Sequence, residues 1–251
     1  MTSRPWIAAL ALAGGAALLA AAPAAADRLI TMKSHTDAME MMGQKTPAQD
    51  ENYLYWFGGD AIRHDTGKVS TILRFDRKQM IWINHDDKTY SVIDLPIDFK
   101  KLVPPEMAPV MEQMATMMAG SAKVTPTDKA GSFGGFDCKF YRVDVNMSMM
   151  AMGMDMCLSD KMPVDYSRYQ SMVESQAALL PSTQWMKDLA KLQGFPVRTD
   201  SATTVMGKTF KSWQELVSSE EKAAPAGTYE PPAGYQEKAF DPMGAGAAKR
   251  R

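Results

Sequence analysis

The sequence predicts an α+β fold that is mainly antiparallel β, and three observations support this class. Residues 52–95 alternate short apolar runs with tight polar turns, as consecutive antiparallel strands do. Residues 107–118 carry apolar side chains at the spacing of one helix face. Residues 138–157 indicate a further strand pair, which is bounded by two cysteines. Parallel strands would need long crossover connections, and 52–95 has only short turns.

The first 26 residues have the features of a secretory signal peptide. Arg4 precedes an apolar run from Trp6 to Ala22, and small residues follow up to Ala26. A retained membrane anchor is the alternative, but the run is shorter than the roughly 20 apolar residues of a spanning helix. We expect cleavage near Ala26 and a soluble protein that is periplasmic or secreted.

The remaining chain has the length and charge of one ordinary globular domain. We assign residues 27–240 to a single domain and residues 241–251 to a disordered tail. The whole chain carries 28 Lys and Arg against 29 Asp and Glu, so it indicates no basic surface suited to nucleic acid. We expect a monomer and leave open a transient partner in the cell envelope.

The first half of the domain reads as strands. Residues 28–36 alternate as a first strand, with Ile30 and Met32 on one side and Lys33 on the other. Residues 37–51 contain turn formers and show no steady period. Beyond them the pattern predicts an antiparallel meander of five strands, at 52–57, 61–65, 69–75, 80–84 and 89–95.

A methionine-rich helix is expected next. It begins at Pro104 and Pro105 and ends at Gly120. It is either an amphipathic helix packed on the sheet or a movable lid with an adaptable underside, because methionine is flexible and polarizable. One face carries Met107, Val110, Met111, Met114, Met117 and Met118.

The segment "NMSMMAMGMDMC", residues 146–157, is dense in methionine, and we interpret it as one side of a hairpin. Export favours a disulfide between Cys138 and Cys157, and a hairpin with these residues opposed places both on the face opposite the methionines. Met147 and Met149 then belong to the turn. The facing pairs are Tyr141 with Met154, Val143 with Met152, and Val145 with Met150.

The last third is expected to contain two helices and two more strands. Residues 163–180 are helix-like, and Pro181 separates them from a second helix that Ser182 begins and Gly194 ends. Residues 195–220 return to strand patterning around a turn at Gly207. A proline-rich approach and a short final strand complete the domain.

No motif predicts catalysis, and we expect a protein that is not an enzyme and holds no cofactor. Arg63, His64 and Asp65 are adjacent on a strand and point to alternating faces, so we interpret them as a solvated strand end. Residues 85–87, "HDD", read as turn chemistry. The glycine loop "AGSFGGF" precedes a strand and lacks the lysine of a phosphate-binding loop.

Several phrases together resemble a known family. They are "YWFGGDAIRHD", "INHDDKTYSVID", "GGFDCKFYRVDV" with its partner cysteine in "DMCLS", "QGFPVRT" and "PPAGYQEKAF". In their order and spacing they resemble an exported bacterial domain-of-unknown-function family that is similar in fold to the lipoprotein carrier LolA. The resemblance implies a curved, incomplete barrel of antiparallel strands, with helices covering its open side and an apolar cavity inside. It implies no catalytic residues.

We therefore expect a periplasmic, non-catalytic binding module that holds a lipid-like or other hydrophobic ligand in a methionine-rich cavity. An ordinary core would use Leu, Ile and Val, which specify one packing better than Met does. The simpler alternative is that the same methionines are core. The expected ligand-binding residues are Met107, Met111, Met114, Met118, Tyr141, Val143, Met150, Met152 and Met154.

A copper-handling protein is the alternative function. Thioethers select Cu(I), and same-face residues on a strand are about 7 Å apart. Against this, the cysteines are assigned to a bridge, and His35, His64 and His85 lie on separate strands or turns. The candidate ligands are Met150, Met152, Met154 and Met156.

Overall fold

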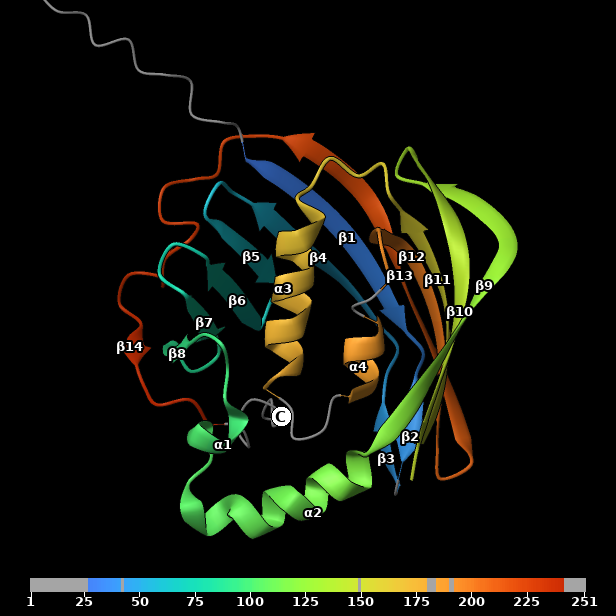
Figure 1. Cartoon of the computed structure of the whole chain (residues 1–251), viewed down its shortest axis with the longest axis horizontal. Helices are drawn as coiled ribbons and strands as arrows, with labels where there is room; N and C mark the ends of the chain where they lie inside the picture. Colours follow the sequence, from blue (N-terminus) through green and yellow to red (C-terminus); the bar gives the residue numbers. More distant parts are fainter. Residues whose placement is uncertain (1–26, 42, 149, 180–183, 190–191, 242–251) are drawn as a thin grey trace, which may run out of the picture.

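The computed structural model describes residues 27–41, 43–148, 150–179, 184–189 and 192–241 (Figure 1). The first strands are β1 (Arg28–Thr36), β2 (Met39–Met41), β3 (Gln44–Thr46), β4 (Gln49–Phe57), β5 (Ala61–Asp65), β6 (Val69–Arg74), β7 (Gln79–Asn84) and β8 (Thr89–Asp94). The later strands are β9 (Gly120–Phe133), β10 (Phe136–Met147), β11 (Met150–Ser159), β12 (Phe195–Val205), β13 (Lys208–Glu221) and β14 (Gln236–Glu237). The helices are α1 (Phe99–Leu102), the 3-10 turn η1 (Pro105–Met107), α2 (Ala108–Met118), α3 (Tyr166–Ala177) and α4 (Gln184–Leu189).

One large sheet dominates the fold. It has twelve strands in the order β14-β8-β7-β6-β5-β4-β1-β13-β12-β11-β10-β9. All neighbours pair antiparallel except β14 and β8. Within the described residues the sheet is not closed into a barrel, because β14 and β9 form its two ends. The predicted class, mainly antiparallel β with a few helices, is confirmed.

The meander is confirmed, but the segment before it is more ordered than its sequence predicts. Strands β4 to β8 pair in chain order. Residues 37–51 contain turn formers and no steady period, yet β2 and β3 form a separate small hairpin there and β4 begins at Gln49. Residues 49–51 are exposed and polar, and their pairing with β1 is through the backbone, which leaves no hydrophobic period in the sequence.

Strand β9 has no counterpart in the sequence prediction. It runs from the end of α2 to the turn at Gly134 and Gly135, where φ is +55° and +84°. Among the described strands it pairs only with β10, and eight of its 14 residues are exposed. Residues 120–125 alternate small or apolar with polar side chains, and Ala122 and Val124 pack in the cluster under α4. Residues 126–133 are mostly polar, as is typical of an edge strand.

The hairpin of β10 and β11 exists, but its predicted register is wrong by two residues. The shift leaves each side chain on its predicted face, because side chains alternate with a period of two. Met147 ends β10 and does not belong to the turn, while Met149 lies outside the described residues. The observed pairs are Tyr141 with Met156, Val143 with Met154, and Val145 with Met152.

The predicted disulfide is present and explains the shift. Cys138 and Cys157 are bonded with their Cα atoms 5.3 Å apart. Cys157 lies directly opposite Phe140, so the bridge joins diagonal positions and not facing ones. Alternation places both cysteines on the face opposite Val143, as predicted, and both are buried in the largest core cluster.

The hydrophobic core has three parts. The largest lies between α3 and the sheet and includes Ile30, Met32 and Phe195, each at most 1% exposed. A second is formed by Ile72 and Ile83 with tyrosines of the C-terminal segment. The third lies under α4 and contains the hairpin methionines. In Figure 1, α3 and α4 lie across one face of the sheet.

Residues 222–240 form a strap around the β8 edge. Tyr229 and Tyr235 pack on Ile72 and its neighbours on one face of the meander. The strap then adds β14 at the edge. Phe240 reaches the other face, where its ring lies 5.9 Å from that of Trp82. The predicted short final strand is confirmed.

The disulfide should contribute measurably to the free energy of unfolding. Replacing both Cys138 and Cys157 by serine removes a cross-link that closes a loop of this size, and it should lower the free energy of unfolding by about 3 kcal/mol. Urea unfolding measures the difference. A reductant should destabilise the wild type by a similar amount and leave the double variant unchanged, whereas equal unfolding of wild type and variant contradicts the prediction.

Candidate functional site

Helix α3 is the element around which the candidate site is built. Asp165 caps its first turn, where the carboxylate accepts hydrogen bonds from the backbone N–H groups of Ser167 at 3.0 Å and Arg168 at 3.3 Å. The helix buries Met172 and Ala177, and Tyr169 packs on Phe195 with ring centroids 4.8 Å apart. The apolar side of α3 therefore faces the sheet.

One arginine fastens α3 to the meander. Arg168 donates from Nη1 to the carbonyl oxygen of Gly58 at 3.3 Å, and its guanidinium lies 5.1 Å from the centre of the Phe75 ring. The same residue pairs with Asp165 at 3.3 Å. These contacts hold the helix above the ends of β4 and β6, so the space beside it is fixed by tertiary contacts.

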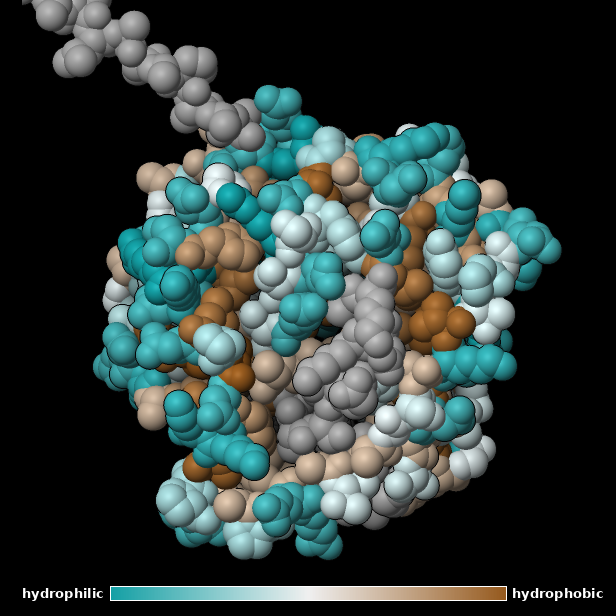
Figure 2. Space-filling model, viewed as in Figure 1, coloured by the Kyte–Doolittle hydropathy of each residue, from teal (hydrophilic) through white to brown (hydrophobic). Residues whose placement is uncertain are grey.

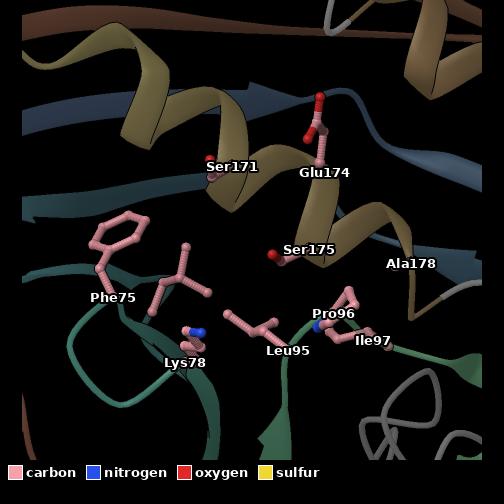
Figure 3. Close-up of a pocket in the computed structure, with 10 residues that line it drawn as sticks. Phe75, Lys78, Leu95, Pro96, Ile97, Ser171, Glu174, Ser175 and Ala178 are labelled. Carbon is pink, nitrogen blue, oxygen red and sulfur yellow. The ribbon is translucent and has the colours of Figure 1, made fainter.

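An open apolar cleft lies between α3 and the ends of β6–β8, with a volume of about 430 Å³ (Figure 3). We name it the α3 cleft. Its volume falls within the ~300–1,000 Å³ typical of small-molecule sites. It is lined by Leu73, Phe75, Lys78, Leu95, Pro96, Ile97, Ser171, Glu174, Ser175 and Ala178.

The lining divides into an apolar floor and a polar rim. Leu73 is buried at 1% exposure, and Leu95 and Ile97 pack against the same core. Lys78 and Glu174 are exposed. Figure 2 shows apolar side chains gathered on both sides of α3, over the meander and over the β10–β11 hairpin. The cleft is thus suited to an apolar body with a polar end.

A second, smaller hollow lies on the other side of α3. It has a volume of about 110 Å³ and is bounded by α3, α4, β11 and β12. We name it the α4 pocket. Met156 and Leu158 of β11 line it, together with Leu189 and Leu192. This hollow is the one that contains part of the predicted methionine stripe.

Three of the hairpin residues that we expected to bind ligand lie in the core cluster beneath α4. Val143 and Met154 are buried, and Met152 packs against them with Trp185 of α4. Tyr141 and Met150 are half-buried. None of these five lines the α3 cleft.

The methionines of the α2 region lie elsewhere. Met111 is buried, Met107 and Met114 are half-buried, and the side chain of Met118 lies outside what the structure describes. The hairpin methionines pack against α4 in the described core cluster, and Met107, Met111 and Met114 do not belong to that cluster. In Figure 1, α2 runs along one end of the molecule.

Three of the four methionines that could bind Cu(I) lie in a core cluster. Met152, Met154 and Met156 belong to the cluster under α4, and Met150 is half-buried at the start of β11. Among the described residues, no group of three or more His, Cys, Asp or Glu side chains could hold a metal ion. No observation favours copper over packing.

The ring of His64 is packed among aromatic side chains, and its interpretation as a solvated strand end is wrong. Its ring stacks on Tyr55 with centroids 4.3 Å apart, and Tyr53 meets it edge-on at 5.6 Å. Its Nε2 is buried without a hydrogen-bond partner in the described chain. Burial lowers the pKa of His64 to about 4. Its neighbours Arg63 and Asp65 pair with each other on the opposite face, as alternation predicts.

The opposite face of the meander carries a serine–histidine contact without the geometry of a catalytic triad. Ser70 Oγ lies 2.6 Å from His85 Nε2. Asp65 accepts a hydrogen bond from Ser70, however, and His85 Nδ1 lies 2.9 Å from the Tyr235 hydroxyl. Ser70 is fully buried, so its hydroxyl is not available to a substrate. The network fixes the strap to the sheet.

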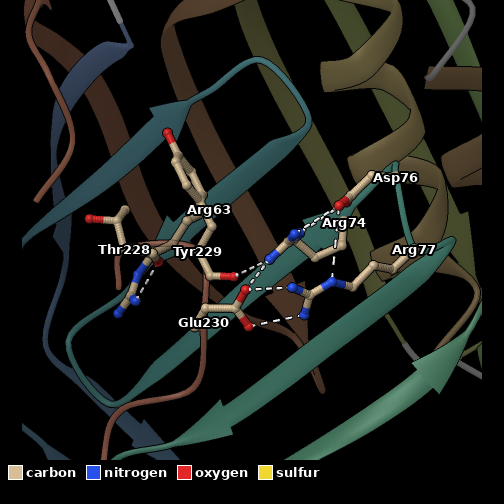
Figure 4. A network of polar contacts seen from close by, with 7 residues as sticks. All are labelled: Arg63, Arg74, Asp76, Arg77, Thr228, Tyr229 and Glu230. Carbon is tan, nitrogen blue, oxygen red and sulfur yellow. Dashed lines mark hydrogen bonds and ion pairs between the residues drawn. The ribbon is translucent and has the colours of Figure 1, made fainter. Parts of the chain in front are cut away.

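A third hollow, of about 380 Å³, lies under the strap and is polar. Arg74 and Arg77 both bind the Glu230 carboxylate there, and Arg74 also pairs with Asp76 at 2.8 Å (Figure 4). These ion pairs lower the pKa of Asp76 to about 2. Because these charged side chains pair with one another within the protein, we interpret the hollow as the place where the strap packs on the sheet.

The α3 cleft could not be found from the sequence. Its floor comes from 95–97, which read as the end of the meander, and its wall comes from small residues of α3, at 171–178, far along the sequence. Helix α3 itself follows the prediction, whereas α4 ends at Leu189, before the expected Gly194 cap. The predicted cap Ser182 lies outside the described residues. The small side chains Ser171, Ser175 and Ala178 were the available signal, since they leave space beside a packed helix.

The chain belongs to a family described as "Domain of unknown function (DUF4412)", whose model matches residues 35–235. The prediction of a domain-of-unknown-function family is confirmed. No curated protein matches the chain.

Two solved structures show distant likeness. One is PNGF-II, with a TM-score of 0.40, 11% sequence identity, and coverage of 88% of this chain and 32% of that one. The other is MucB, with a TM-score of 0.33, 12% identity, and coverage of 84% of this chain and 58% of that one. The chain therefore spans about a third of PNGF-II and little more than half of MucB. Likeness at this level carries no argument about function.

The described helices are all too short or too polar to cross a membrane.

Buried His64 predicts a loss of stability in acid. Its pKa lies below the value of 6.5 for an exposed histidine, so from pH 6.5 down to about 4 the unfolded chain takes up a proton that the folded chain does not. The melting temperature of the wild type should therefore fall between pH 7.5 and 5, and His64→Gln should reduce that fall.

His35 supplies an internal control, because its pKa is shifted in the opposite direction to that of His64. Its hydrogen bond to Asp50 raises its pKa, so its contribution is present below pH 6.5 and is lost as the pH rises. His35→Gln should make the acid loss larger. Identical pH profiles for His64→Gln and the wild type would show that His64 is not buried in the neutral form.

The lack of a side chain at Gly58 should be needed for the strap to pack on the sheet. A Cβ atom at this position would lie 2.7 Å from the hydroxyl oxygen of Tyr229, whereas one at Gly59 would meet nothing within 4 Å. Gly58→Ala should displace the strap and destabilise the protein by about 1–3 kcal/mol. Gly59→Ala should change stability by less than about 0.5 kcal/mol.

Hydrogen exchange locates the effect of Gly58→Ala. The amides of Gln236 and Lys238 donate to carbonyls of β8 or its preceding turn, at 3.0 and 2.8 Å. They should exchange faster in Gly58→Ala and at the wild-type rate in Gly59→Ala. Equal exchange in both variants would mean that Tyr229 does not seat the strap.

Proposed function

We propose that this protein is a periplasmic, non-catalytic binding module that holds a lipid-like or other hydrophobic ligand in the α3 cleft. The observation that carries the proposal is a hollow of about 430 Å³ whose floor is apolar and continuous with the largest core cluster. Water in such a hollow makes few hydrogen bonds to the apolar walls, so its replacement by an apolar ligand is favourable.

The architecture suits such a role if the sheet acts as a curved, incomplete barrel with helices over its open side. In this proposal α3 and α4 cover the inner face, and α3 divides the interior into the α3 cleft and the α4 pocket. The sheet supplies a rigid wall, because each strand is hydrogen-bonded to its neighbours. The helices supply the wall that can adjust.

The methionines of β11 fit this role as an adaptable lining. Met156 lines the α4 pocket, and Met152 and Met154 pack behind it. Because methionine has three rotatable bonds and a polarizable sulfur, this wall can change shape at low cost. The α4 pocket can then enlarge when a ligand chain passes beneath α3.

Two further features support the proposal: the expected export of the chain, and a buried serine that is not available for catalysis. The leader-like N-terminus and a disulfide are the combination expected of a periplasmic or secreted protein. The buried Ser70, whose acid partner binds the serine and not the histidine, supports a non-catalytic role.

Filling the α3 cleft tests the proposal. Ser175→Trp places an indole where a ligand would lie and should weaken binding of the neutral fluorescent probe N-phenyl-1-naphthylamine at least tenfold. Fluorescence titration of protein stripped of co-purified lipid measures the affinity. Ser121→Trp, at an exposed position of β9, is the matched control and should bind as the wild type does.

Two results would reject the α3 cleft as the site. One is probe binding that Ser175→Trp leaves unchanged, and the other is no binding by the stripped wild type. Native mass spectrometry of protein from the periplasm gives an independent readout, because a co-purified lipid should be present in the wild type and reduced in Ser175→Trp.

A further inference from the structure

We infer that the ligand of the α3 cleft is an amphiphile with an anionic head group, and that Lys78 recognises this group. The inference rests on the proposed function and names the chemical class of its ligand. It follows from where Lys78 lies, from the pairing of the charges around it, and from the direction of Glu174.

Lys78 is fixed at the mouth of the cleft by its backbone. It ends the turn between β6 and β7 with φ at +51°, a left-handed conformation that is uncommon for a lysine. Its carbonyl oxygen accepts a hydrogen bond from the backbone N–H of Leu95 at 2.9 Å. Leu95 is part of the cleft floor, so the ammonium group is tethered beside the apolar surface.

The other charges of this turn are already matched. Arg74 pairs with Asp76 at 2.8 Å, and Arg77 pairs with Glu230 at 2.8 Å. Within the described chain, Lys78 has no side-chain partner. The turn therefore presents one unmatched positive charge, and that charge borders the cleft.

The one acidic residue of the lining is directed elsewhere. Glu174 accepts a hydrogen bond from the side-chain amide of Gln170 at 3.2 Å, one turn earlier in α3. Figure 3 shows its carboxylate pointing away from Phe75 and Leu95. An anionic head group at Lys78 therefore does not meet the Glu174 carboxylate first.

An ammonium group beside an apolar floor selects ligands that combine a hydrocarbon chain with a negative group. A carboxylate or a phosphate accepts charge-assisted hydrogen bonds from lysine, whereas an alcohol offers a weaker partner and a quaternary ammonium group is repelled. Because Lys78 is exposed, the preference should be modest, about fivefold in Kd. A fatty carboxylate and a phospholipid phosphate share this chemistry.

Four ten-carbon amphiphiles test the inference. Decanoate, decyl phosphate, decanol and decyltrimethylammonium are compared at pH 8, below micelle formation, by displacement of N-phenyl-1-naphthylamine. The wild type should bind the two anions about fivefold more tightly than decanol and the cation most weakly. The ratio between decanoate and decyl phosphate distinguishes a fatty acid from a phospholipid head group.

The variants separate Lys78 from the general charge of the protein. Lys78→Gln should remove the preference for anions, and Lys78→Arg should keep it. Lys88→Gln is the matched control, because Lys88 also lies in a turn, with φ at +52°, and its carbonyl also accepts a backbone hydrogen bond, but it does not line the cleft. It should retain the wild-type preference.

The outcomes distinguish this inference from the function on which it rests. Equal affinities for all four amphiphiles, or a preference that survives in Lys78→Gln, overturn the role of Lys78 and leave the binding function standing. A lower melting temperature for Lys78→Gln with unchanged affinity ratios would mean that Lys78 contributes to stability and not to recognition, and it also overturns the inference. Failure of every amphiphile to bind overturns both.

Discussion

The packing of α3 against the sheet is the interaction on which the rest of the structure depends. The ring of Tyr169 packs against both Tyr55 and Phe195, and Met172 is only 1% exposed beneath the helix. Full burial of such a side chain contributes about 1.5–3 kcal/mol. The same packing creates the two hollows, because a helix laid across a sheet leaves space along both of its sides. Core stability and the candidate site therefore have one origin.

Polar groups hold this arrangement in place at its margins. Arg168 ties α3 to Gly58, and Gly58 is also the position on which Tyr229 of the strap packs. One glycine thus lies between the helix on one face and the strap on the other. His64 remains neutral under the helix because burial lowers its pKa, which links the stability of this region to the acidity of the surroundings.

The sequence predicted what is local and missed what depends on distant partners. The meander, α2 and α3 follow from residue periodicity, and the bridge between Cys138 and Cys157 follows from export and spacing. The hairpin register differs by two because the bridge joins diagonal positions, which spacing does not distinguish from facing ones. Strand β9 was missed because only residues 120–125 alternate, whereas 126–133 include Pro126, Asp128 and Gly131, which are typical of turns. Trp185 and Leu189 of α4 pack against the hairpin methionines, and the sequence did not predict this contact.

Strand β9 has a consequence for how the protein behaves at high concentration. It is 14 residues long and lies at the end of the sheet, and among the described strands it pairs only with β10. Such an edge can add a second chain and start a fibre. Pro126 lacks a donor, and Lys123 and Lys129 bring positive charge to the same strand, so an approaching copy meets a broken ladder and like charges. These residues therefore disfavour edge-to-edge association between two copies of the chain.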